Sequence, residues 1–133
     1  MENTMNNVQF TRRAAIGAAS AALLASTTAF AHHGWAWTED ETYQLTGAIE
    51  DIYLGNPHAR LKIKAADGVW DVDLAPPART LRAGFDESAA KVGDAVTATG
   101  NRSRDHGQRV MKAVTIEVNG KRYDVYPDRV RPS

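Results

Sequence analysis

Short runs of alternating apolar and polar residues dominate the sequence from Tyr43 onward. Leu61 and Ile63 alternate with charged neighbours, and Trp70 and Val72 alternate with aspartates. A period of two places every second side chain on the same face of a β-strand. The chain is therefore expected to fold mainly as strands that each bury one face.

The order of these runs narrows the architecture. Strands are expected around residues 43–54, 60–64, 70–74, 96–98, 110–118 and 123–125. A change of apolar parity between Ile49 and Ile52 predicts a bulge in the first strand. Pro76-Pro77 ends the third and begins a short helix, whose Leu81 and Phe85 we expect on the core because they lie four residues apart. The prediction is an all-β fold with one short helix, an OB-like small β-barrel, to which the turn at Asn119-Gly120 adds an extra C-terminal hairpin strand.

Residues 1–31 have the features of a cleavable export signal. Arg12-Arg13 supply a positive region, an alanine-rich apolar stretch follows, and Ala29-Phe30-Ala31 is a small-x-small cleavage site. The Arg pair, preceded by Thr11, resembles a twin-arginine signal, and a general secretory signal is the alternative. We therefore expect a periplasmic protein, cleaved near Ala31, with no membrane span after cleavage.

The remaining chain is long enough for one domain. We expect an N-terminal arm over residues 32–42, an OB-like barrel domain over 43–128 and a loose tail over 129–133. Removing residues 1–31 leaves 14 basic and 15 acidic residues, a net charge of −1. That balance gives no electrostatic attraction to nucleic acid, which we do not expect as a partner.

The absence of cysteine leaves nitrogen and oxygen ligands for any metal. Cleavage after Ala31 would make His32 the first residue, so that its amine and imidazole could chelate one ion. A further imidazole, from His58 or His106, would complete a T-shaped set of three nitrogens that suits Cu(II). Cleavage after Phe30 would instead place His33 third, in the amino-terminal Cu(II) motif that uses the amine, backbone amides and imidazole.

Other interpretations of the histidines remain open. Histidines at a loose terminus bind metal incidentally, and Asn56-Pro57 is a turn signal after which His58 can simply finish the strand. His106 lies in a polar turn and is a reserve ligand. Arg102, Arg104 and Arg109 surround the same loop, and we expect a solvated surface there rather than an anion site.

Three short motifs, taken in order, resemble one family. They are His32-His33-Gly34-Trp35, Asn56-Pro57-His58 and Val92-Gly93-Asp94-Ala95-Val96. They are similar to motifs of DUF6152, small exported bacterial proteins that carry His-His-Ser-aromatic, Asn-Pro-His and Gly-Asp-x-Val. This sequence departs at Gly34 and at Leu54-Gly55. The resemblance implies the location and the fold, but it carries no activity and no catalytic residue.

Three hypotheses for the function therefore remain. The first is a non-enzymatic protein that binds copper through His32, with His58 and then His33 as further ligands and His106 in reserve. The alternative is a binding or assembly module for an envelope partner or small ligand. A copper oxidoreductase is a third hypothesis, which would use a substrate face near Trp35 and Trp37. We lean against an enzyme because the chain has no nucleophile with a local base, no phosphate loop and no zinc-protease helix.

Overall fold

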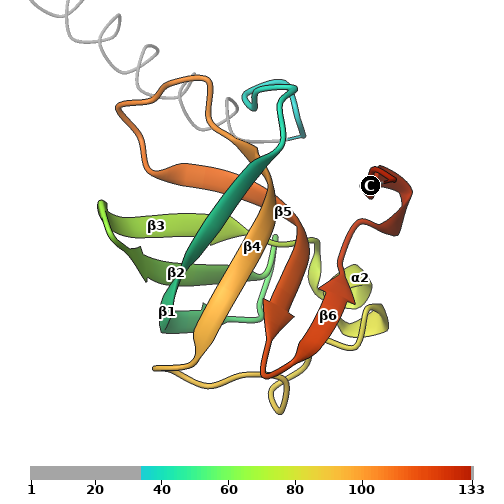
Figure 1. Ribbon diagram of the computed structural model, residues 1–133. Coiled ribbons are helices and arrows are strands. Elements are labelled where there is room, and N and C mark those ends of the chain that lie inside the picture. The colour runs from blue at the N-terminus through green and yellow to red at the C-terminus, as the bar shows by residue number, and fades with distance from the viewer. Residues whose placement is uncertain (1–33, 133) are drawn as a thin grey trace, which may run out of the picture. The chain divides into compact units, whose positions relative to one another are not determined.

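The computed structural model describes residues 34–132 and divides the chain into two units between Trp37 and Thr38. The second unit holds all the regular structure described here (Figure 1). Its strands are β1 (Tyr43–Tyr53), β2 (Arg60–Ala65), β3 (Gly68–Asp73), β4 (Ala95–Arg102), β5 (Val110–Val118) and β6 (Lys121–Asp124). Helix α2 (Pro77–Arg82) connects β3 to β4, and a 3-10 turn, η2 (Pro127–Arg129), follows β6.

The strands form a closed OB-like barrel of five strands with β6 added as an extension. Their order is β3-β2-β1-β4-β5-β6, and the neighbouring pairs are antiparallel. The barrel closes where β3 pairs with β5 in parallel, through Asp71–Asp73 and Val110–Lys112. The predicted fold class is therefore confirmed.

The barrel interior is filled by the alternating residues that the sequence identified. Trp70 is fully buried, stacks on Tyr43 at 5.3 Å between ring centroids, and donates its indole N–H to Asp67 Oδ1 at 2.9 Å. At another part of the core, Phe85 meets Tyr123 edge to face at 5.2 Å. These aromatic pairs bury large apolar areas while the indole N–H, the polar atom of Trp70, keeps a partner.

Two local predictions are confirmed. The register of β1 against β2 shifts between Ile49 and Asp51, which is the bulge that the parity change indicated. Asn119 and Gly120 both have positive φ, 53° and 74°, as a type I′ hairpin turn requires.

The prediction for Leu81 was wrong. Its side chain is 62% exposed, whereas Thr80 is buried and donates its hydroxyl to the Ala75 carbonyl at 2.8 Å. The helix ends at Arg82, and Gly84 turns the chain at φ 93° before Phe85 enters the core. Leu81 and Phe85 therefore do not lie on one helical face, and the spacing argument does not apply.

At Gly100 two strands approach each other closely. A Cβ added there would lie 2.0 Å from the Lys112 carbonyl oxygen and 2.9 Å from Ala113 Cα. Both atoms belong to the backbone of β5, beside the register shift between β4 and β5. The strands would have to separate to accept any side chain.

We predict that Gly100→Ala lowers the free energy of unfolding by about 3 kcal/mol, because overpacking against backbone cannot be relieved by a rotamer change. Urea denaturation measures the effect. Gly107→Ala is the matched control, since its Cβ would meet only the movable carboxylate of Asp105, at 3.1 Å. Equal stability of the Gly100 variant and the native protein would contradict the close strand approach.

Candidate functional site

Two of the four histidines, His58 and His106, lie within the described residues. His32 and His33 lie outside the described residues. His58 is half-buried in the connection between β1 and β2, after the Asn56-Pro57 peptide bond, which is cis. His106 lies in the exposed connection between β4 and β5.

His58 belongs to a polar cluster at the barrel closure. Asp73 and Lys112 are register partners across the parallel β3–β5 pair, and Lys112 is only 4% exposed. Burial raises the pKa of Asp73, while the positive charges of His58, Arg60 and Lys112 act in the opposite direction. Burial likewise lowers the pKa of Lys112, against the attraction of Asp73.

The segment after β6 contributes Tyr126 to this cluster. The Lys112 ammonium lies 5.5 Å from the centre of the Tyr126 ring, and the Arg79 guanidinium lies 5.2 Å from it. Burial raises the pKa of the Tyr126 phenol. Arg79 also pairs with Asp128 at 3.5 Å, which links α2 to η2. The cluster thus joins the barrel closure to the C-terminal segment.

The two aspartates of β3 have different surroundings. Asp71 is exposed and pairs with Lys62 at 3.3 Å, as a solvent-facing residue would. Asp73 is partly buried, lies beside Lys112 of β5 and interacts electrostatically with Tyr126. Groups with such shifted pKa values mark functional sites in some proteins and structural ion networks in others. Opposite charges that meet at the barrel seam suit the structural role.

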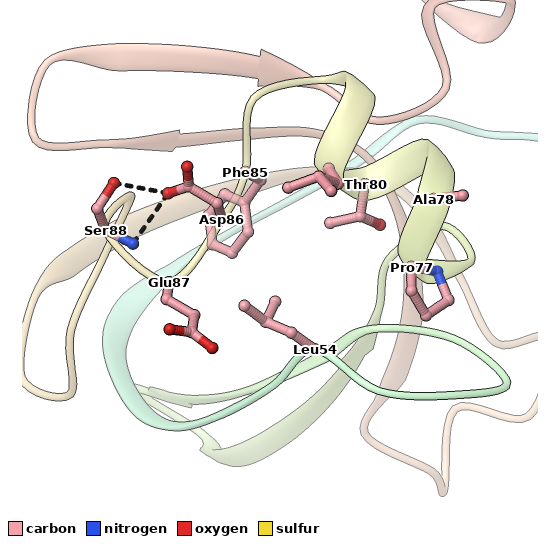
Figure 2. Close-up of a pocket in the computed structure, with 9 residues that line it drawn as sticks. Leu54, Pro77, Ala78, Thr80, Phe85, Asp86, Glu87 and Ser88 are labelled. Carbon is pink, nitrogen blue, oxygen red and sulfur yellow. Dashed lines mark hydrogen bonds between the residues drawn. The ribbon is translucent and has the colours of Figure 1, made fainter.

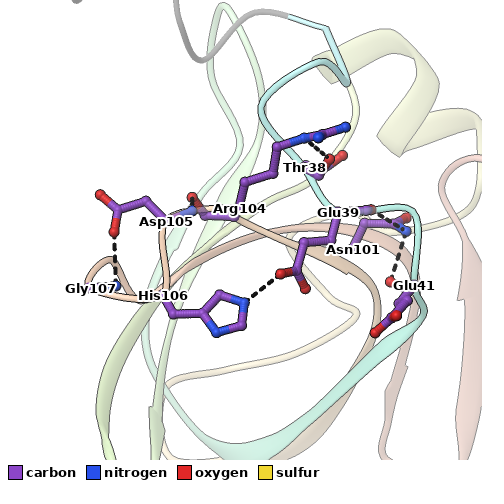
Figure 3. Close-up of polar contacts among 9 residues, drawn as sticks. Thr38, Glu39, Glu41, Asn101, Arg104, Asp105, His106 and Gly107 are labelled. Atoms are coloured by element: carbon purple, nitrogen blue, oxygen red, sulfur yellow. Dashed lines mark hydrogen bonds and ion pairs between the residues drawn. The ribbon is translucent and has the colours of Figure 1, made fainter.

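A second polar network holds the start of the barrel unit (Figure 3). Thr38 forms a β-bridge with Ser103, and the Glu39 amide donates to the Arg102 carbonyl at 2.9 Å. The Asn101 side chain donates to the backbone carbonyls of Glu39 and Glu41, and Arg104 Nε donates to the Thr38 carbonyl at 2.9 Å. We call residues 38–41 with residues 101–106 the clasp.

His106 takes part in the clasp through one ring nitrogen. Its Nε2 forms a short hydrogen bond with Glu39 Oε1, and 59% of the imidazole side chain is exposed. In the neutral imidazole, an Nε2–H that donates to a carboxylate leaves Nδ1 with a lone pair. A carboxylate behind an imidazole in this way is the arrangement that commonly orients a metal-binding histidine.

The arginines near this loop have separate partners. Arg102 lies over the rings of Tyr43 and Trp70, at 4.9 and 5.0 Å from their centres. Arg104 serves the clasp, and Arg109 pairs with Asp67 at 3.6 Å. The three guanidinium groups thus contact different parts of the protein.

Within residues 34–132, no three His, Asp or Glu side chains are grouped so as to hold a metal ion. Over the same residues, no helix is long and apolar enough to cross a membrane.

A cleft beside α2 was not predicted from the sequence. It has a volume of about 510 Å³ and an apolar lining that includes Leu54, Pro77, Leu81 and Phe85 (Figure 2). Asp86, Glu87 and Ser88 form its polar side. Leu81, whose exposure the helical spacing failed to predict, lines this cleft.

We predict that the Asp73 carboxyl titrates above 3.8, the ordinary value for aspartate, because burial disfavours its charge. Since the folded protein then holds the proton more tightly, this group's contribution to stability falls as pH rises through the titration. Carbon-detected NMR of the Asp73 carboxyl measures the midpoint. Lys112→Met should raise it further, and a native midpoint at or below 3.8 would contradict the effect of burial.

The comparisons with known proteins support the fold. No curated protein matches the sequence. Among solved structures, the ZRD-deleted mutant of TiaS in complex with agmatine superposes with a TM-score of 0.50 and 17% identity, over 68% of this chain and 28% of that one. A TiaS complex with transfer RNA, AMPCPP and agmatine gives 0.46 and 18%, over 59% of this chain and 18% of that one. The chain thus spans less than a third of either protein.

The sequence comparison identifies the family. Residues 21–112 match a family of unknown function, DUF6152. The match includes the His32-His33 pair, Asn56-Pro57-His58 and the barrel through Lys112, which is well over half of the chain. The protein therefore belongs to the DUF6152 family.

Proposed function

We propose that the processed protein is an exported, periplasmic and non-enzymatic barrel that binds one Cu(II) ion, with His32 supplying its amine and imidazole and His106 supplying the third nitrogen. The pairing of His106 Nε2 with Glu39 Oε1 carries this choice of histidine. It leaves Nδ1 available on an exposed ring that a carboxylate orients.

The length of the arm also supports His106. Thr38, where the clasp begins, lies six positions after His32, so the arm spans at most about 20 Å when fully extended. Thr38 pairs with Ser103, three residues before His106. His58 instead lies within the charged cluster of Asp73 and Lys112, where several positive groups would repel a bound cation.

Processing would control this site. The α-amine of His32 exists only after cleavage behind Ala31, and an amine with a pKa near 8 loses its proton readily enough to bind metal at neutral pH. In the precursor the same nitrogen is an amide within the chain. His33, the second residue, would then lie next to the chelate without being required for it.

We predict that the processed protein binds one Cu(II) at least tenfold more tightly than a His-His-Gly-Trp peptide, because His106 adds a ligand that the peptide lacks. Competition titration with a chromophoric chelator gives both affinities. His106→Asn should remove this advantage over the peptide. Glu39→Gln should reduce the affinity of the protein for Cu(II) by about tenfold. His32→Ala should abolish tight binding.

His58→Asn is the matched control and should leave the affinity unchanged. The precursor, confirmed by mass spectrometry to retain residues 1–31, should bind no better than the peptide. Equal affinities for protein and peptide would rule out the proposed site. Turnover of peroxide by the copper-loaded protein would contradict its non-enzymatic nature.

A further inference from the structure

The cleft beside α2 has an apolar floor that the fold leaves open. Phe85 is buried beneath it, and Leu54 packs against the core from the end of β1. Leu81 contributes an exposed aliphatic side chain to the wall of the cleft. The volume of the cleft, about 510 Å³, lies within the range of small-molecule sites.

The polar groups of this cleft are satisfied by the protein, with one exception. The Thr80 hydroxyl donates to the Ala75 carbonyl, and Asp86 Oδ1 accepts from the Ser88 amide at 2.9 Å and its hydroxyl at 2.6 Å. Glu87 has no hydrogen bond or ion pair with any other residue of the described chain. Figure 2 shows its carboxylate beside the Leu54 side chain.

We propose that this cleft binds a small amphiphilic cation, with its hydrocarbon body against Leu54, Leu81 and Phe85 and its ammonium group on the Glu87 carboxylate. Charge complementarity selects this occupant. The Glu87 carboxylate would attract an ammonium group, whereas an anionic ligand would be repelled by both Glu87 and Asp86. The site is independent of the copper proposal because none of its residues belongs to the clasp or to the histidines.

The test uses n-octylammonium, octan-1-ol and octanoate as probes of the purified protein. Isothermal titration calorimetry should give saturable binding of one octylammonium, about fivefold tighter than octanol because of the partly exposed ion pair. Octanoate should bind more weakly than either. Amide and methyl chemical shifts should place the ligand at Leu54, Ala78 and Leu81.

Paired variants separate the charge from the apolar contact. Glu87→Gln should equalise the affinities for octylammonium and octanol, while Glu50→Gln, on the exposed face of β1, should preserve the preference. Leu81→Gln should weaken both ligands by about tenfold. Val92→Gln is its control, since Val92 is equally exposed at 62% but lies outside the cleft.

Circular dichroism and urea denaturation verify that each variant folds. We expect that they fold because the substituted positions are exposed. The proposal is overturned if octylammonium does not saturate, if octanol binds as tightly, or if the preference survives Glu87→Gln. It is also overturned if Val92→Gln weakens binding as much as Leu81→Gln. Because the cleft shares no residue with the clasp, the copper titration can fail without affecting this result, and the reverse also holds.

Discussion

The parallel pairing of β3 with β5 is the contact that turns a meandering sheet into a barrel. It consists of three residue pairs, from Asp71 with Val110 to Asp73 with Lys112. Closure satisfies two strand edges that would otherwise expose unpaired backbone groups, and it encloses Trp70, Val72 and Met111. It also brings a carboxylate and an ammonium side by side at the seam, where the segment containing Tyr126 packs beside them.

Much of this fold follows from local patterns. Alternation identified the strands, the parity change located the bulge at Ile49, and Asn119-Gly120 specified the last hairpin. Such signals are readable because they depend on neighbours along the chain. Leu81 was misjudged because its assignment required knowing that α2 ends at Arg82, and propensity does not fix helix ends so closely.

The polar sites were less predictable for a physical reason. Lys112 looks like an outward-facing strand residue, and only the distant segment around Tyr126 buries it. The pairing of His106 with Glu39 joins residues 67 positions apart, and no local spacing encodes it. His106 was therefore treated as a reserve ligand, whereas the clasp makes it the histidine that the proposed copper site uses first. Glu87 and Leu81 likewise line one cleft because the chain turns after α2.

The central claim is that copper binds at the clasp rather than at the barrel seam. Cu(II) is paramagnetic and broadens the NMR signals of nearby nuclei, so one equivalent added to the processed protein reports its position directly. If copper binds at the clasp, broadening should be confined to the N-terminal arm, Glu39 and residues 101–108, and the signals of His58 and Asp73 should be unaffected. Broadening centred on His58, or spread evenly over the surface, would contradict it.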